Sequence, residues 1–129
     1  MTLTREQLKK MSDLELDEVV PKVAGWREDD HPEVNGTGPW MVEYEYPVYY
    51  KQDGTMIESF GYYPTEDINQ TLELESEVIE LDVDLYIREL ASLLGIDGYP
   101  FNRNIVAKML QATPRQRTIA AILTLQGGD

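Results

Sequence analysis

The sequence predicts an α+β protein that forms a single domain over residues 1–129, and three observations support this class. An alternating stretch at 40–50 followed by Asp53-Gly54 predicts a β-hairpin. Capped apolar segments towards both ends of the chain predict helices. A length of 129 residues, 42% of them hydrophobic and 27% charged, suits one globular domain with one core.

The N-terminal region contains two predicted helix starts. Thr4 and Ser12 are each followed three residues later by Gln or Glu, which is the pattern of a capping box. The second start opens a helix that we expect to kink or end near Pro21, because proline lacks a backbone donor, and to stop at Gly25. The polar segment 27–39, rich in glycine and proline, is predicted to be a loop.

The alternating stretch places its aromatic residues on one face of a strand. Pro47 predicts an edge strand or a bulge, because proline cannot donate to a ladder, and 55–60 is the expected partner strand. We interpret the aromatic face as core, which leaves Tyr49 on the opposite face and Trp40 at the strand entrance as binding candidates. The residues of the aromatic face are Trp40, Val42, Tyr44, Tyr46, Val48 and Tyr50.

The middle of the chain predicts a helix and then an ambiguous segment. Thr65 is the expected N-cap of a helix over 66–80, with acidic residues in its first turn. Apolar residues alternate over 81–87 as in a strand, but 85–94 carries a helical stripe with a glycine stop, and a helix is favoured there.

The last part of the chain contains one ambiguous segment and one clear helix. Residues 103–112 fit either a helix or a strand, and a strand is favoured. The final helix is predicted from Thr113 as N-cap and Pro114 as the first helical residue, and it runs to Gly127-Gly128.

The charge of the chain is strongly acidic and unevenly distributed. A net charge of −13 argues against direct nucleic-acid binding, because phosphates would be repelled. Residues 98–128 contain four basic and no acidic residues, which leaves seven basic against 24 acidic elsewhere, a net −17. An anionic ligand would therefore be attracted to the C-terminal quarter.

The absence of cysteine and of long apolar runs limits the chemistry of the protein and the compartment in which we expect it. The chain has no cysteine, so disulfides, thiol catalysis and thiolate metal sites are excluded. No apolar run is long enough for a membrane span, and the polar N-terminus does not predict a signal peptide. We expect the protein to act in the cytoplasm and away from membranes.

Three stretches resemble one known family. They are "MSDLELDEVVPKVAGW" at 11–26, "YYPTEDINQTLELESEVIE" at 62–80 and "ATPRQRTIAAILTLQG" at 112–127, about 50 of the 129 residues. Together they resemble phage ABA sandwich domains, small proteins of tailed phages. The chain departs from that family at Pro21, inside the first helix, and at Leu72, where the family usually has tryptophan.

The resemblance implies a phage-encoded protein with helices packed on both sides of a small antiparallel sheet. The segment 81–104 is more helix-like than the corresponding strands of the family. The family has no shared catalytic motif, so the resemblance assigns no functional residue. Function must therefore be argued from the residues of this chain.

Candidate catalytic and metal-binding residues are few. His31 is the only histidine, and the chain has no nucleophile elbow of the Gly-x-Ser-x-Gly type. The acidic cluster at 28–33 could bind Mg²⁺ or Ca²⁺ through oxygen ligands, and Asp82 and Asp84 could act as paired carboxylates on a strand. Solvent-exposed charge is the favoured interpretation of each of these features.

The start of the last helix is the best anion-binding candidate in the sequence. Free backbone N–H groups follow Thr113, and Arg115 and Arg117 lie beside them. Arg103 and Lys108 supply the other positive charges of the segment. Exposed arginines on a capped helix are the alternative interpretation.

These observations predict a non-enzymatic binding protein that needs no cofactor. The first hypothesis is that it sequesters a small anionic, nucleotide-type signal of host immunity in the host cytoplasm, as a counter-defence protein. The alternative is an acidic DNA mimic or protein inhibitor of a basic host defence protein. A metal- or acid-dependent hydrolase is a third possibility, and a homo-oligomer is expected because the predicted edge strand needs a cover.

Overall fold

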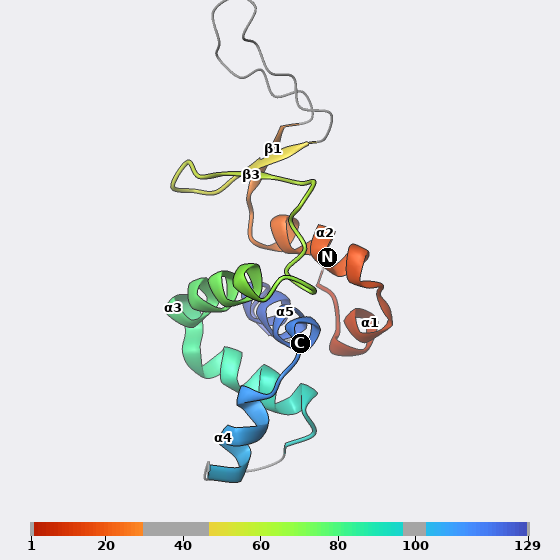
Figure 1. The fold of residues 1–129 in the computed structure, drawn as a ribbon, viewed down its shortest axis with the longest axis vertical. Coiled ribbons are helices and arrows are strands. Elements are labelled where there is room, and N and C mark those ends of the chain that lie inside the picture. The colour runs from red at the N-terminus through yellow and green to blue at the C-terminus, as the bar shows by residue number, and fades with distance from the viewer. Residues whose placement is uncertain (1, 30–46, 97–102, 129) are drawn as a thin grey trace, which may run out of the picture. The chain divides into compact units, whose positions relative to one another are not determined.

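The structure is a computed structural model that describes residues 2–29, 47–96 and 103–128. The chain is α+β, as predicted, with a small antiparallel sheet and helices (Figure 1). It divides into a helical unit, formed by Met1–Ala24 and Tyr63–Asp129, and a sheet unit, Gly25–Tyr62. The predicted packing of helices on both faces of the sheet, in a single domain, stays a prediction.

The sheet unit contains three short antiparallel strands in the order β1-β2-β3. These strands are β1 (Arg27–Asp29), β2 (Val48–Tyr50) and β3 (Met56–Glu58). The predicted hairpin between β2 and β3 is confirmed. Its turn is closed by the Lys51 N–H donating to the Thr55 carbonyl at 2.9 Å, and Gly54 has the positive φ of 88° that such a turn requires.

Two predictions for the sheet unit are wrong. Residues 27–29 form an edge strand and not a loop, because polar side chains are tolerated on a strand whose outer side faces solvent. The strand after Pro47 is central and not an edge, since β2 pairs with both neighbours. Pro47 lies one residue before β2, so its missing N–H removes no ladder bond, and its carbonyl accepts from Ser59 N at 3.0 Å.

An aromatic cluster forms the core of the sheet unit. The Trp26 ring lies 6.5 Å from the ring of Tyr49 and 5.6 Å from that of Tyr62, centroid to centroid. Val48 is fully buried, in agreement with the predicted core face of the strand. The prediction is wrong for the next two residues, because Tyr49 of the opposite face is buried and Tyr50 of the predicted core face is only partly buried, with Arg27 over its ring at 4.3 Å. The part of that predicted face from Trp40 to Tyr46 lies outside the described residues.

The helical unit is built around its last helix. Its helices are α1 (Arg5–Lys10), α2 (Asp13–Val23), α3 (Ile68–Leu93), α4 (Arg103–Leu110) and α5 (Pro114–Leu125). Helix α5 packs against α1, α2 and α3 (Figure 1), and every residue of 118–124 is buried. The predicted capping boxes at Thr4 and Ser12 are confirmed, and Thr113 forms a third.

Helix α2 passes through Pro21 and ends two residues later. The missing N–H of Pro21 removes only one bond in the last turns, and its ring is fully buried. Gly25, with a φ of 73°, follows the helix as the expected stop.

The predicted cap at Thr65 is wrong. Asp67 caps α3, because its carboxylate accepts from the backbone N–H groups of Asn69 at 2.9 Å and Gln70 at 3.3 Å. Thr65 is buried and binds Asp17 instead. Its backbone N–H and its hydroxyl donate to the two carboxylate oxygens of Asp17 at 3.0 and 2.9 Å.

Helix α3 continues through the ambiguous segment with one break. The helix predicted for 85–94 is confirmed, and the strand alternative for 81–87 is wrong. Asp82 has a non-helical backbone (φ −160°, ψ 88°), and its carboxylate accepts from Leu85 N at 3.1 Å. Asp82 thus caps the second half of α3, and it does not share a strand face with Asp84.

The strand favoured for 103–112 is also wrong, because this segment forms α4. Its apolar residues recur three and four positions apart, as Val106 and Leu110 illustrate, which suits a helix lying on one neighbour. No helix of the described residues is long and apolar enough to cross a membrane.

Candidate binding surface

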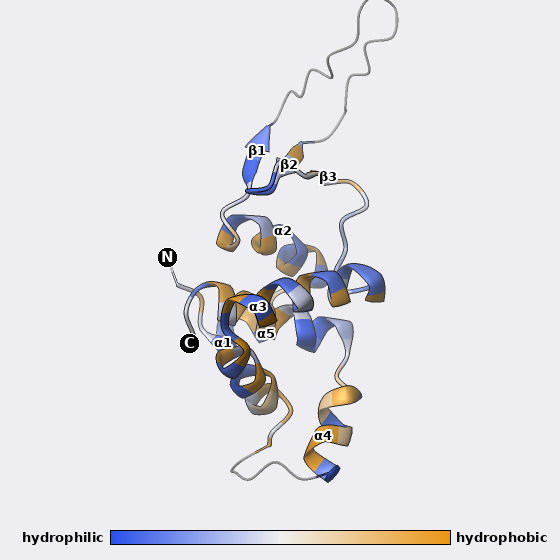
Figure 2. Cartoon of the chain, turned by 90° about the vertical axis from the view of Figure 1, so that its left-hand side faces the viewer, coloured by the Kyte–Doolittle hydropathy of each residue, from blue (hydrophilic) through white to orange (hydrophobic). Residues whose placement is uncertain are grey.

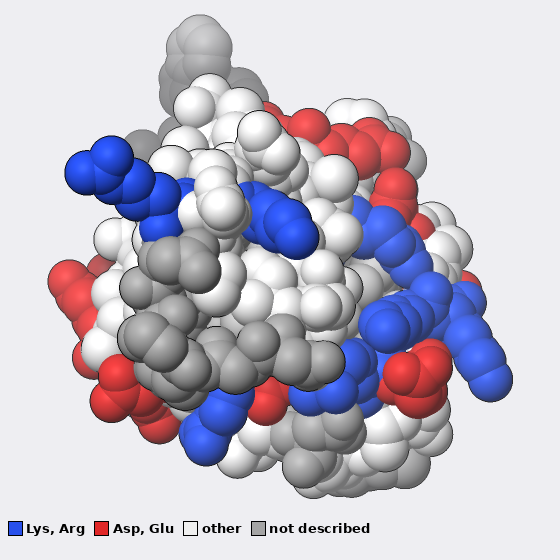
Figure 3. Space-filling model, turned by 90° about the horizontal axis from the view of Figure 1, so that it is seen from below, with Lys and Arg blue, Asp and Glu red and all other residues white. Residues whose placement is uncertain are grey.

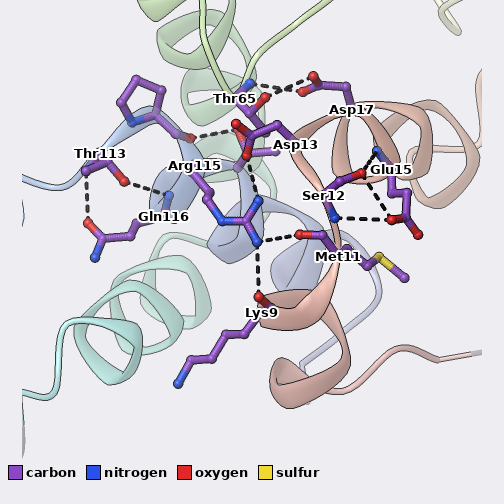
Figure 4. A network of polar contacts seen from close by, with 12 residues as sticks. Lys9, Met11, Ser12, Asp13, Glu15, Asp17, Thr65, Thr113, Arg115 and Gln116 are labelled. Carbon is purple, nitrogen blue, oxygen red and sulfur yellow. Dashed lines mark hydrogen bonds and ion pairs between the residues drawn. The ribbon is translucent and has the colours of Figure 1, made fainter.

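Arg115, the first residue of the predicted anion site, is held by the helical unit itself. Its guanidinium pairs with Asp13 at 2.6 Å and donates to the carbonyls of Met11 at 2.6 Å and Lys9 at 3.1 Å (Figure 4). These contacts tie the start of α5 to the junction between α1 and α2. The side chain therefore serves as a clamp between helices.

Arg117 is engaged in the same way on the other side of α5. Its Nη1 pairs with Glu75 of α3 at 2.7 Å. Its Nε donates to the Ala112 carbonyl at 3.0 Å and its Nη2 to that of Leu110 at 3.0 Å, so the guanidinium also closes the turn after α4. Its side chain is mostly buried.

The other predicted anion-binding residues that the structure describes belong to different elements. Thr113 caps α5 through Gln116 (Figure 4), and Arg103 and Lys108 are exposed on α4. Figure 3 shows basic side chains beside acidic ones on the face seen from below, so an anion would meet both signs there. Tyr49 is 8% exposed and packs on Trp26, so its ring does not present a free face.

The candidate catalytic and metal-binding groups belong to separate elements as far as the structure describes them. Asp82 caps a helix, and Asp84 is an exposed neighbour. Glu28 and Asp29 lie in β1, whereas His31 and the rest of the acidic cluster lie outside the described residues. Within residues 2–29, 47–96 and 103–128 no group of acidic or histidine side chains is arranged to hold a metal ion.

The outer side of α3 carries a line of exposed apolar side chains, which we name the α3 face. Ile68, Leu72 and Ile79 are spaced four and seven residues apart and therefore lie on one side of the helix. Leu72 is 47% and Ile79 39% exposed. Leu81 and Val83, on either side of the bend, are exposed as well, but Leu81 is two residues from Ile79 and lies on another side of the helix.

The same helix is surrounded by negative charge. From Glu66 to Ile87 the chain contains eight acidic residues and no basic residue. These are Glu66, Asp67, Glu73, Glu75, Glu77, Glu80, Asp82 and Asp84. An exposed apolar face flanked by carboxylates attracts a surface that is both apolar and basic.

A groove of about 300 Å³ lies where α4 approaches α3. Its walls are apolar. The hydropathy colours of Figure 2 show that much of α4 is hydrophobic. The lining residues are Glu75, Ile79, Tyr86, Ile87, Leu90, Val106, Met109, Leu110 and Arg117. Ile79 belongs to both the groove and the α3 face, so the two form one continuous surface.

The polar residues of the groove form a connected cluster. The Tyr86 hydroxyl donates to Glu75 Oε2, and Arg117 Nη1 contacts the same oxygen at 2.7 Å. Burial raises the pKa of Tyr86, and the hydrogen bond to Glu75 and its charge raise it further. The tyrosine therefore stays protonated and acts as a hydrogen-bond donor.

The sequence contained a signal for this surface that the strand interpretation obscured. Glu75 and Ile79 are four residues apart, as are Val106 and Leu110, and this spacing places each pair on one side of a helix. A strand at 103–112 would not provide the helix that forms the second wall of the groove, so this wall was not predicted. The bend at Asp82, which lets both halves of α3 contribute to the groove, had no sequence signal beyond the alternation at 81–87.

Comparison with protein-family models, curated proteins and solved structures gave no match to this chain. The resemblance to phage ABA sandwich domains stays a prediction from the three sequence stretches.

Proposed function

We propose that this protein is a non-enzymatic binding protein that docks a basic, amphipathic segment of another protein on the α3 face. The observation that carries the proposal is the combination of exposed apolar side chains with a run of acidic residues on one helix. This is the protein-inhibitor alternative that the charge distribution of the sequence predicts.

The chemistry of the α3 face favours a basic partner over a second copy of the chain. Burial of Leu72 and Ile79 would supply affinity, at roughly 25 cal/mol for each Å² of apolar surface removed from water. Two copies meeting through this face would bring eight acidic residues from each chain close together, and like charges oppose that contact. A lysine- or arginine-rich helix would meet complementary charge along the same line.

Capture of a small anionic ligand is the less supported proposal. Arg115 and Arg117 have their guanidinium groups engaged by protein oxygens, and a ligand would have to displace those contacts. Arg103 and Lys108 are exposed and supply what positive charge such a ligand could use. The phage origin, the counter-defence role, the host cytoplasm and the homo-oligomer stay predictions from the sequence.

A titration with matched peptide probes tests the proposal. One probe is a helical peptide with leucine along one face and lysine elsewhere, and its counterpart carries glutamate in place of lysine. We expect the lysine peptide to bind and to raise the melting temperature, and the glutamate peptide to do neither. Binding should weaken as salt increases from 0.1 M to 1 M, where the screening length falls from about 10 Å to about 3 Å.

Two outcomes would argue against the proposal. Equal binding of both peptides would mean that the negative charge has no part in recognition. Stabilisation by nucleotides, with none by the lysine peptide, would support the anion-capture hypothesis instead.

A further inference from the structure

The size of the groove between α3 and α4 limits what can fill it. Its volume of about 300 Å³ is at the lower end of the range for ligand pockets. A groove of this size accommodates one long side chain or one small molecule. Its continuity with the α3 face at Ile79 favours a side chain that belongs to a segment docked on that face.

The walls of the groove call for an aliphatic chain. Val106 and Leu110 of α4 face it, and Leu110 is 72% exposed. Leaving such surface in water is unfavourable, and the methylene stem of a lysine or arginine can cover it while the head group reaches a polar partner.

Glu75 determines which head group the groove accepts. Both contacts of its carboxylate with described residues fall on Oε2, from the Tyr86 hydroxyl and from Arg117 Nη1. Within the part of the chain that the structure describes, Oε1 accepts no hydrogen bond. A carboxylate oxygen can only accept, so an occupant must bring a donor, and an anionic head group would be repelled.

We infer that the groove receives one lysine or arginine side chain of the partner, with its stem against Ile79, Val106 and Leu110 and its cationic head donating to Glu75 Oε1. The inference rests on the proposed function and identifies the anchor of the docked segment. Arg117 balances part of the charge of Glu75, so recognition depends on the charge-assisted hydrogen bond to the open oxygen.

Three small probes with the same stem test this inference without any partner protein. Methyl groups of Ile79, Val106, Met109 and Leu110 would be followed by NMR while n-pentylammonium, n-pentanol or pentanoate is added. We expect n-pentylammonium to shift these methyl signals saturably and to bind about tenfold more tightly than pentanoate, with n-pentanol in between. Absence of saturable shifts, or tighter binding of pentanoate, would overturn the inference.

Variants test separately the apolar wall and the carboxylate of the groove. Leu110→Ala removes an exposed wall and should weaken n-pentylammonium binding several-fold, whereas Leu14→Ala, at a leucine of α2 that is 59% exposed, should leave it unchanged. Glu75→Gln should abolish the preference for n-pentylammonium over n-pentanol. Equal effects of the two leucine variants, or a preference that survives in Glu75→Gln, would contradict the proposed geometry.

The outcome is separable from that of the proposed function. If the methyl groups respond to n-pentylammonium but the lysine peptide does not bind, the groove is a cation site and the docking role fails. If the peptide binds on the α3 face and n-pentylammonium has no effect, only the anchor inference fails.

Discussion

Arg115 connects three segments of the helical unit with one guanidinium group. It pairs with Asp13 at the start of α2 and donates to the carbonyls of Lys9 and Met11 at the end of α1. The planar fork of donors matches this arrangement of oxygens, which the single ammonium of a lysine cannot reproduce. The residue that the sequence suggests for anion binding therefore has a structural role.

Substitution of Arg115 should test that role. Arg115→Ala should lower the free energy of unfolding by about 1 kcal/mol, a modest value because Asp13 is partly exposed. Arg115→Lys should recover little of this free energy of unfolding, because lysine keeps the positive charge but lacks the planar set of guanidinium donors. Urea denaturation of both variants measures this, and full recovery by lysine would show that charge alone matters at this position.

Asp17 gives the helical unit a pH-dependent contribution to stability. Burial raises the pKa of Asp17, although the two hydrogen bonds from Thr65 oppose the shift. The folded protein therefore holds this proton more tightly than the unfolded chain does. Stability from this group is largest below the pKa of the unfolded chain and falls as pH rises through the folded pKa.

Asp17→Asn should remove this dependence while keeping an acceptor for Thr65. We expect the free energy of unfolding of the variant to gain on that of the wild type as pH increases from about 3 to 7. Chemical denaturation at several pH values measures the difference between the two proteins. A difference that is constant, or that changes in the opposite direction, would contradict the raised pKa.

The bend in α3 depends on a single cap within the helix. Asp82 satisfies Leu85 N at the start of the second half, where the intrahelical acceptor is lost. Asp82→Ala should cost about 1 kcal/mol of unfolding free energy, the usual value for an N-cap. Asp84→Ala is the matched control at an exposed carboxylate two residues on and should be nearly neutral in the same thermal or urea melts. Equal effects would indicate general charge relief along this acidic helix.

Elements with explicit end signals were predictable, and those without them were not. The capping boxes at Thr4, Ser12 and Thr113 each mark a helix that the structure contains. Asn102 precedes the segment 103–112 in the sequence, but no Glu or Gln follows it three residues later, so the capping-box pattern is missing. The short apolar pattern of the segment suits either period, and its helix was therefore missed. Thr65 is a residue type that suits an N-cap, but its hydroxyl donates to the buried carboxylate of Asp17 instead. This tertiary contact overrides the local preference.

The α3 face should bind as one element. Leu72→Gln combined with Ile79→Gln keeps the charge of the helix and removes exposed apolar surface, so affinity for the lysine peptide should fall by about tenfold or more. Leu14→Gln, on α2, is the control and should bind as the wild type does. Isothermal titration calorimetry measures both, and an unchanged affinity in the double variant would place the peptide elsewhere.

At the scale of the whole molecule, net charge suggests a class of partner but does not locate a site. A charge of −13 points to basic partners from composition alone. The location of the site depends on which charges remain available after folding. The guanidinium groups of Arg115 and Arg117 are paired with carboxylates of the helical unit. The sequence does not distinguish such paired arginines from exposed ones, whereas the structure does.

The central claim is that the acidic, apolar α3 face is the binding surface, and one measurement addresses it directly. Amide and methyl NMR spectra recorded during titration with the lysine peptide would map the contact on the folded protein. We predict saturable shifts concentrated between Ile68 and Val83 that weaken in 1 M salt. Shifts concentrated instead at the start of α5, around Arg115, or in the sheet unit would contradict it.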